Sequence, residues 1–140
     1  MFERILLAVD GSEHALHAAK TAGDLARAVH AKELCIVFAY EPVPEYLGEP
    51  NMQKTINSRL NESQTTVEEA ERAVGKVPAE IPTKMLEGPA ADAIIGVAKT
   101  HHSDLIVMGS RGLRRLAGAL LGSNSQRVVS EAPCPVLVVR

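Results

Sequence analysis

Glycine and serine residues gather in two segments of the second half of the chain, residues 109–112 and residues 122–125. The first segment follows the apolar run 105–108, and the second begins a stretch, residues 123–132, with the pattern of a helix. Glycine lets a ligand approach the backbone without meeting a Cβ atom, and a helix N-terminus offers unpaired N–H groups with a partial positive charge. This order of strand, loop and helix is typical of phosphate sites in α/β proteins.

The same residues also fit a plain surface loop, in which the glycines only make turns and Ser123 is the N-cap of the helix. Three arginines lie between the glycines, and a guanidinium binds phosphate through two parallel hydrogen bonds. Arg111 stands next to Gly112 and is the candidate we select, whereas Arg114 and Arg115 are left undecided. Solvated loop charges are the alternative for all three.

Apolar runs alternate with helical periodicity along the whole chain, which predicts α/β structure. The runs fall at residues 5–9, 34–39, 83–86, 105–108 and 136–139. Apolar stripes at helical spacing occupy residues 15–29, 52–74 and 91–98, and a fourth helix is predicted over residues 123–132. Right-handed crossovers between such strands predict a single-domain, Rossmann-like open parallel sheet of five strands with helices on both faces.

A strand order of 3-2-1-4-5 would place the ligand crevice between strands one and four, where the order reverses. Asp10 leaves the first strand and Gly109 leaves the fourth, so the two would face each other across this crevice. A carboxylate there can accept hydrogen bonds from ribose hydroxyls or hold Mg²⁺ through water. The alternative for Asp10 is a turn residue that precedes the first helix.

Several other kinds of site are not predicted. Neither G-x-x-x-x-G-K-[ST] nor a G-x-G-x-x-G after the first strand is present, and no G-x-S-x-G occurs. We expect the five histidines to be surface imidazoles away from the crevice, because they fall on helices or at helix ends. They are His14, His17, His30, His101 and His102. Cys35 and Cys134 lack metal-ligand spacing, and we expect two reduced core thiols.

The composition restricts the classes of partner. The formal net charge is −2 over 140 residues, and no basic stripe is visible, so the sequence predicts neither a nucleic-acid nor a membrane partner. The start of the chain has no signal-peptide pattern, which leads us to expect a cytoplasmic protein. Aromatic residues make up only 3 % against 46 % hydrophobic, which predicts an aliphatic core.

Over residues 4–140 the chain resembles the ATP-binding branch of the universal stress protein family. The resemblance rests on residues 10–12 after the first strand, the pair Glu41 and Pro42, residues 109–112 and the closing segment 133–139. The family's ATP-binding signature, G-x-x-G-x9-G-[ST], is met by Gly109, Gly112, Gly122 and Ser123. The resemblance implies one universal stress protein domain over residues 1–140, with the strand order 3-2-1-4-5.

The resemblance also implies a ligand, ATP with Mg²⁺ or alternatively ADP or AMP, and a role for each position. Asp10 would lie near the ribose and adenine, with Ala39 and Met108 along the adenine pocket. The residues implied to hold the phosphates are Gly109, Gly112, Gly122, Ser123, the Asn124 backbone and Ser125.

Family members are commonly homodimers joined through the last strand, here Val136 to Val139. Nothing follows this apolar strand to cover its edge, which independently favours pairing with a second copy. The family often has Gly-Asp-Pro before the third helix, whereas this chain has Gly88, Pro89 and Ala90, so the N-cap side chain is missing there.

Three functions therefore remain open. The first is an ATP-binding universal stress protein that acts as a nucleotide-dependent regulatory homodimer. The second is a slow ATPase or phosphotransfer enzyme at the same site, for which only Asp10 and the loop serines could orient water or an acceptor hydroxyl. The third is a protein-interaction module without nucleotide. Because no catalytic residue is identified, the sequence favours a protein that holds ATP over one that consumes it.

Overall fold

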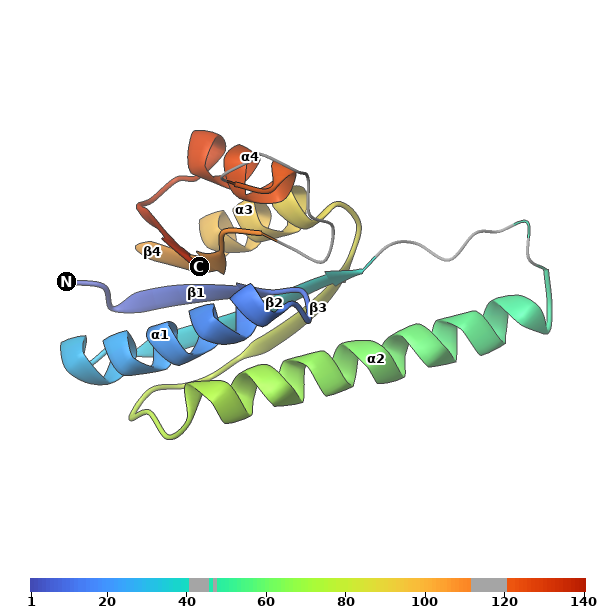
Figure 1. Ribbon diagram of the computed structural model, residues 1–140, viewed down its shortest axis with the longest axis horizontal. Helices are drawn as coiled ribbons and strands as arrows, with labels where there is room; N and C mark the ends of the chain where they lie inside the picture. Colours follow the sequence, from blue (N-terminus) through green and yellow to red (C-terminus); the bar gives the residue numbers. More distant parts are fainter. Residues whose placement is uncertain (41–45, 47, 112–120) are drawn as a thin grey trace.

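The computed structural model describes residues 1–40, 46, 48–111 and 121–140. They form β1 (Arg4–Val9), α1 (Glu13–Val29), β2 (Glu33–Tyr40), α2 (Asn51–Val74), β3 (Thr83–Glu87), α3 (Ala90–Thr100), β4 (Leu105–Gly109), α4 (Ser123–Glu131) and β5 (Val136–Val139). All strand pairs are parallel, and the sheet order is β3-β2-β1-β4-β5, as predicted (Figure 1). The fold is therefore a single-domain α/β fold with an open five-stranded sheet.

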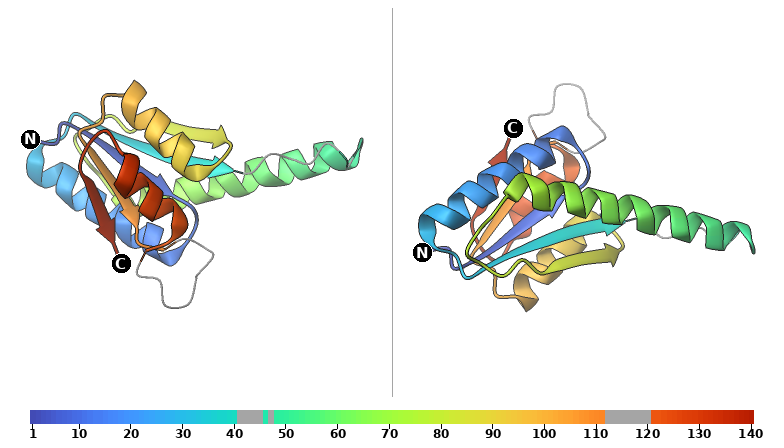
Figure 2. Two further views of the ribbon diagram at one scale, coloured as in Figure 1. Left: turned by 90° about the horizontal axis from the view of Figure 1, so that it is seen from above. Right: turned by 90° about the horizontal axis from the view of Figure 1, so that it is seen from below.

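Two aliphatic clusters hold helices against the two faces of the sheet. In β1, Ile5, Leu7 and Val9 face α1 and α2, whereas Leu6 and Ala8 face α3 and α4. This alternation follows from the period-2 geometry of a strand. Figures 1 and 2 show the same layers, with α1 and α2 on one side of the sheet and α3 and α4 on the other.

The helix ends have local causes. Ser12 is the N-cap of α1, and its hydroxyl accepts a hydrogen bond from the Ala15 amide at 3.2 Å. Helix α2 ends at Gly75, which has a positive φ of 75°. Helix α3 follows Pro89 without a side-chain cap, as its sequence predicted. Helix α4 begins at Ser123 as predicted, with Gly122 as its N-cap, so the alternative in which Ser123 caps this helix does not hold.

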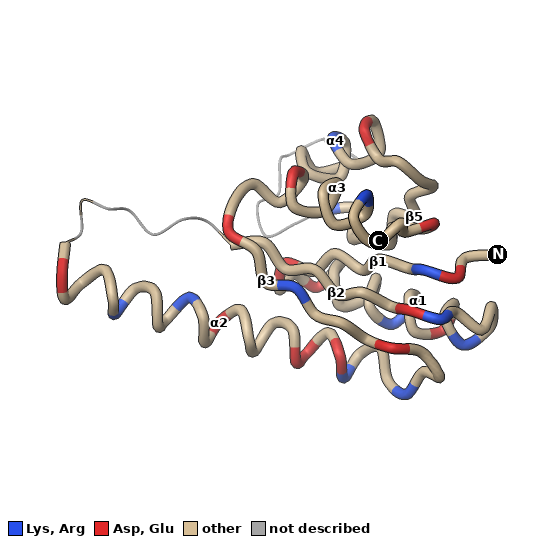
Figure 3. Tube along the Cα trace, turned by 180° about the vertical axis from the view of Figure 1, so that it is seen from behind, with Lys and Arg blue, Asp and Glu red and all other residues tan. Residues whose placement is uncertain are grey.

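Only the second half of α2 packs on the body of the protein. Its buried residues are Ser63, Val67, Ala70 and Val74. The first half extends past the sheet, and charges of both signs occur along the helix (Figures 2 and 3). Although α2 is long, no helix among the described residues combines the length and apolarity needed to cross a membrane.

The two cysteines are free thiols, as predicted. Cys35 is fully buried in β2, and this burial raises the pKa of its thiol to about 11. Cys134 is half-buried and packs against the cluster under α3 and α4. A raised pKa keeps a thiol protonated, so the Cys35 side chain behaves as a small apolar group.

A close contact between α1 and α2 requires a glycine in α1. A Cβ atom built on Gly23 would lie 2.2 Å from the Val74 carbonyl oxygen. We expect Gly23→Ala to lower the free energy of unfolding by ~2–3 kcal/mol, because the helices must move apart. The matched control is Gly96→Ala in α3, where a Cβ meets nothing within 4 Å.

Urea denaturation of the two variants checks this contact. Gly96→Ala should be stabilising by ~0.5–1 kcal/mol, since alanine is the better helix former. Equal unfolding free energies for Gly23→Ala and the wild type would contradict the close approach of α1 to α2.

Candidate functional site

The carboxyl ends of β1 and β4 lie side by side at the reversal point of the sheet. Their register pairs Ile5 with Leu105 and Leu7 with Val107. Asp10 follows the one strand and Ser110 follows the other. The strand order therefore confirms the prediction that Asp10 and the start of residues 109–112 lie at the same end of the sheet, where β1 and β4 end.

The two residues expected along the adenine pocket occupy the same face of the sheet. Met108 belongs to the cluster under α3 and α4 and is 6 % exposed. Ala39 is two residues beyond Val37, which belongs to the same cluster, so it has the same parity along β2. Strand β1 runs between them and contributes Ala8 to this face. Ala39 itself is only half-buried.

Asp10 shapes the turn between β1 and α1. Its Oδ1 accepts a hydrogen bond from the Ser12 amide at 2.9 Å, and the intervening Gly11 has a φ of 84°. Asp10 thus has the turn role that the sequence left open. A carboxylate has further acceptor lone pairs, which suit the hydroxyl donors of a ribose.

Gly109 is the last residue of β4, and its glycine identity has a packing cause. A Cβ atom there would lie 2.9 Å from both the carbonyl carbon and the Cβ of His14. Gly109 is not among the glycines with positive φ. The first turn of α1 occupies that space and so requires a glycine here, whereas the expected approach of a ligand to Gly109 stays a prediction.

Ser110 joins three elements through its three polar groups. Its amide donates to the Val139 carbonyl of β5 at 2.7 Å, and its carbonyl accepts from the Gly122 amide before α4 at 2.8 Å. Its hydroxyl lies 2.8 Å from Nδ1 of His14 in α1. Ser110 is 4 % exposed. The backbone that leaves β4 is thereby held to α1, α4 and β5 together.

The expectation that all histidines lie away from the crevice was wrong for His14. It sits in the first turn of α1, beside Gly109 and Ser110. Sequence reasoning missed it because its partner is 96 residues away, and only the position of His14 four residues after Asp10 could have indicated it. His101 instead lies at the opposite end of the strands, where its Nδ1 is 3.2 Å from Glu33 at the start of β2.

The start of α4 forms the second side of the site. Ser123 and Asn124 are exposed in its first turn, whereas Ser125 is buried and donates its hydroxyl to the Gly109 carbonyl at 2.9 Å. The hydroxyl donor of Ser125 is therefore already used within the protein. What α4 offers a ligand is the positive end of the helix and its first amides.

The loop between these two sides is only partly described. Arg111 is half-buried, and its carbonyl oxygen lies 3.5 Å from the Ser12 hydroxyl. Gly112, Arg114 and Arg115 lie outside the described residues, as do Glu41 and Pro42. Within the described part of the chain, the site therefore consists of Asp10, the residues 109–111 and the start of α4.

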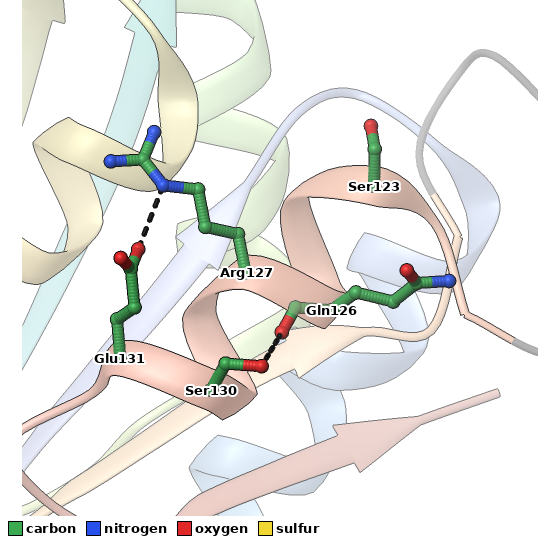
Figure 4. Close-up of a pocket in the computed structure, with 5 residues that line it drawn as sticks. All are labelled: Ser123, Gln126, Arg127, Ser130 and Glu131. Carbon is green, nitrogen blue, oxygen red and sulfur yellow. Dashed lines mark hydrogen bonds and ion pairs between the residues drawn. The ribbon is translucent and has the colours of Figure 1, made fainter.

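The pocket in Figure 4 lies elsewhere, on the outer surface of α4. Its lining residues are Ser123, Gln126, Arg127, Ser130 and Glu131. Arg127 points to Glu131 at 2.8 Å and also pairs with Asp92 of α3, so its charge is already neutralised. Apart from Ser123, the pocket contains none of the predicted site residues, and the contact of α4 with α3 explains its charges.

The described side chains at the site do not form a metal-binding cluster by themselves. No group of three or more histidine, cysteine, aspartate or glutamate side chains that could hold a metal exists among the residues the structure describes. Asp10 offers one carboxylate where β1 ends. A single carboxylate fits Mg²⁺ that is held mainly by nucleotide phosphates and water, which is the usual arrangement for this ion.

Two serines of α4 should differ in their effect on stability. Ser125→Ala leaves the Gly109 carbonyl without its buried donor, and we expect a loss of ~1–2 kcal/mol in the free energy of unfolding. Ser123→Ala removes an exposed hydroxyl and should change it by less than ~0.5 kcal/mol. Chemical denaturation compares the two, and a Ser123 variant as unstable as the Ser125 variant would contradict these roles.

Comparison with known proteins identifies the family. The model of the universal stress protein family matches residues 1–140. A universal stress protein of Thermus aquaticus is 49 % identical over 140 residues, with 100 % of both chains covered. The structure of universal stress protein UspA from Lactobacillus plantarum is similar with a TM-score of 0.86 and 26 % identity, over 99 % of this chain and 98 % of that one.

A further universal stress protein, solved in complex with cAMP, is similar with a TM-score of 0.69 and 31 % identity, over 99 % of this chain and 97 % of that one. The family model, the coverage of the relatives and the strand order all indicate the same family. The chain belongs to the universal stress protein family.

Proposed function

We propose that the protein is a cytoplasmic stress-response homodimer whose activity is regulated by ATP bound between the carboxyl ends of β1 and β4. The observation that carries this proposal is the position of Asp10 and the start of α4 at one edge of the sheet. The similar universal stress protein in complex with cAMP supports an adenine nucleotide as the ligand. The two free thiols suit a reducing compartment.

Gly122 supports the phosphate part of the proposal. Its φ of −68° and ψ of 164° are accessible to any residue, so the backbone conformation does not demand glycine. Close approach of a ligand to the backbone is a reason for glycine that remains, and Gly122 directly precedes the first amides of α4. The phosphates would bind there, with Arg111 and Gly112 on the other side.

Ala39 and Met108 support the base part. The small side chain of Ala39 leaves room beside β2, and the thioether of Met108 is a soft, polarizable surface for an aromatic ring. Asp10 would accept from ribose hydroxyls between this wall and the phosphates. ATP is proposed over ADP and AMP because the signature extends from Gly109 to Ser123, which provides glycines on both sides of a chain of phosphates.

Nucleotide binding is tested by calorimetry with ATP, ADP, AMP and cAMP in the presence and absence of Mg²⁺. We expect heat of binding for the wild type, tightest with ATP and Mg²⁺. Gly122→Val should weaken binding at least about tenfold, equivalent to ~1.4 kcal/mol, because its side chain fills the phosphate space. Gly122→Ala is the smaller step, and thermal melts establish that both variants are folded.

The control is Gly96→Ala, which lies in α3 in open space and should bind as the wild type does. If none of the four nucleotides gave heat of binding at about 1 mM, where even weak binding is visible, the proposal would be refuted. A folded Gly122→Val that binds normally would place the phosphates elsewhere.

Homodimer formation is proposed through β5, one of the two edge strands of the sheet. The other edge strand, β3, carries Lys84 and Glu87, whereas β5 carries only apolar residues and exposes Leu137 by 37 %. Charged edges resist pairing and apolar ones favour it. The Ile106 amide donates to the Pro135 carbonyl, and the Ser110 amide donates to the Val139 carbonyl. Because backbone groups alternate between the two sides of a strand, the amides and carbonyls of Val136 and Val138 point to the free edge.

This geometry makes Val138→Pro a specific test of the dimer. Proline removes an amide that faces the free edge and leaves the bonds between β4 and β5 in place. We expect the variant to sediment as a monomer under conditions in which the wild type sediments as a dimer. Val138→Thr keeps the amide and the branched shape and should remain dimeric, and a monomeric wild type would exclude this assembly.

A further inference from the structure

Ser110 is the residue through which the glycine segment is attached to its surroundings. Its amide and carbonyl bond to β5 and to the N-cap of α4, and both of those bonds are made by backbone groups. Its hydroxyl bonds to Nδ1 of His14 at 2.8 Å. Ser110 is therefore held by two backbone bonds and, among the described residues, by one side chain, the imidazole of His14.

The imidazole of His14 is held in place from several sides. The backbone of its own turn packs on Gly109, where a Cβ would come within 2.9 Å of His14. Ser12, two residues before His14, caps the helix. The ring stacks on His17 with 6.5 Å between centroids and 20° between planes, and Nδ1 of His17 lies 3.0 Å from the Arg140 carbonyl oxygen. A side chain restrained in this way can position its partner.

We propose that His14 is a positioning residue of the nucleotide site, which acts on affinity by holding Ser110. The inference rests on the proposed function and adds a residue that the family signature does not contain. Ser110 connects the segment that leads into the glycine loop with the N-cap of α4, so its position sets the separation of the two sides of the phosphate site. Fixing that separation before the ligand arrives lowers the cost of ordering the site on binding.

The atom involved makes the proposal specific. Nδ1 is the ring nitrogen that bonds to Ser110, and it stands at the position that the terminal amide group of asparagine can reach. Glutamine instead extends to the position of Nε2. We therefore expect His14→Asn to keep the bond to Ser110 and both His14→Gln and His14→Ala to lose it.

Calorimetric titration with MgATP measures the effect. His14→Ala should weaken binding about five- to tenfold, the consequence of losing one buried hydrogen bond that organises the site. His14→Asn should bind within about twofold of the wild type, and His14→Gln should resemble His14→Ala. Gly96→Ala in α3, where a Cβ atom meets nothing within 4 Å, is the control and should leave the affinity unchanged.

A double-mutant cycle separates action through Ser110 from direct contact with the ligand. Ser110→Ala should weaken binding as much as His14→Ala does, and the double variant should be no weaker than either single one. Additive losses would overturn the proposal in favour of independent contacts. An unchanged affinity for His14→Ala, or equal rescue by glutamine and asparagine, would overturn it as well.

Hydrogen exchange of the protein without nucleotide gives a second readout. The Gly122 amide is bonded to the Ser110 carbonyl, so it should exchange several-fold faster in folded His14→Ala and at the wild-type rate in His14→Asn. Should the wild type bind no nucleotide, the proposed function fails and this exchange still decides the role of His14. Equal exchange of Gly122 in His14→Ala and the wild type would refute the positioning of Ser110.

Discussion

The first turn of α1 packs directly on the end of β4, and the candidate site depends on this contact. Gly109 has no side chain, which lets the His14 backbone approach to a distance that a Cβ atom would forbid. The approach brings the imidazole of His14 to the hydroxyl of Ser110. It also brings Ser12 next to the carbonyl of Arg111. Residues after β1 and residues after β4 thus become one unit.

Of the described glycines and serines at the candidate site, some have structural roles and others are proposed to face the ligand. Gly109 is explained by the packing of α1, and the Ser125 hydroxyl is used by the Gly109 carbonyl. Gly122 has an ordinary backbone conformation and Ser123 is exposed, so neither backbone strain nor burial accounts for these two residues. A motif of this kind therefore specifies both the frame of a site and the surface it presents.

Ser110 also links the proposed nucleotide site to the proposed dimer edge. Its amide bonds to the Val139 carbonyl in β5, and its carbonyl bonds to the Gly122 amide at the start of α4. A ligand that orders the start of α4 would thereby act on the strand that we propose to pair with a second copy. This is a short physical path for nucleotide-dependent regulation, because it needs only the backbone of one residue.

The sequence by itself determined the order of the strands and helices along the chain and where they lie in it. Buried strands of a parallel sheet are continuous aliphatic runs, and helices repeat every 3.6 residues, so both patterns are visible in one dimension. The shared edge of Asp10 and the glycine segment followed from strand order.

Only the tertiary structure decided the roles of His14, Ser110 and Gly109. Their roles come from contacts between residues that are almost a hundred positions apart, and no local periodicity or motif records such a contact. For the same reason His14 looked like a surface histidine in the sequence, although the packing of α1 on β4 brings it into the site.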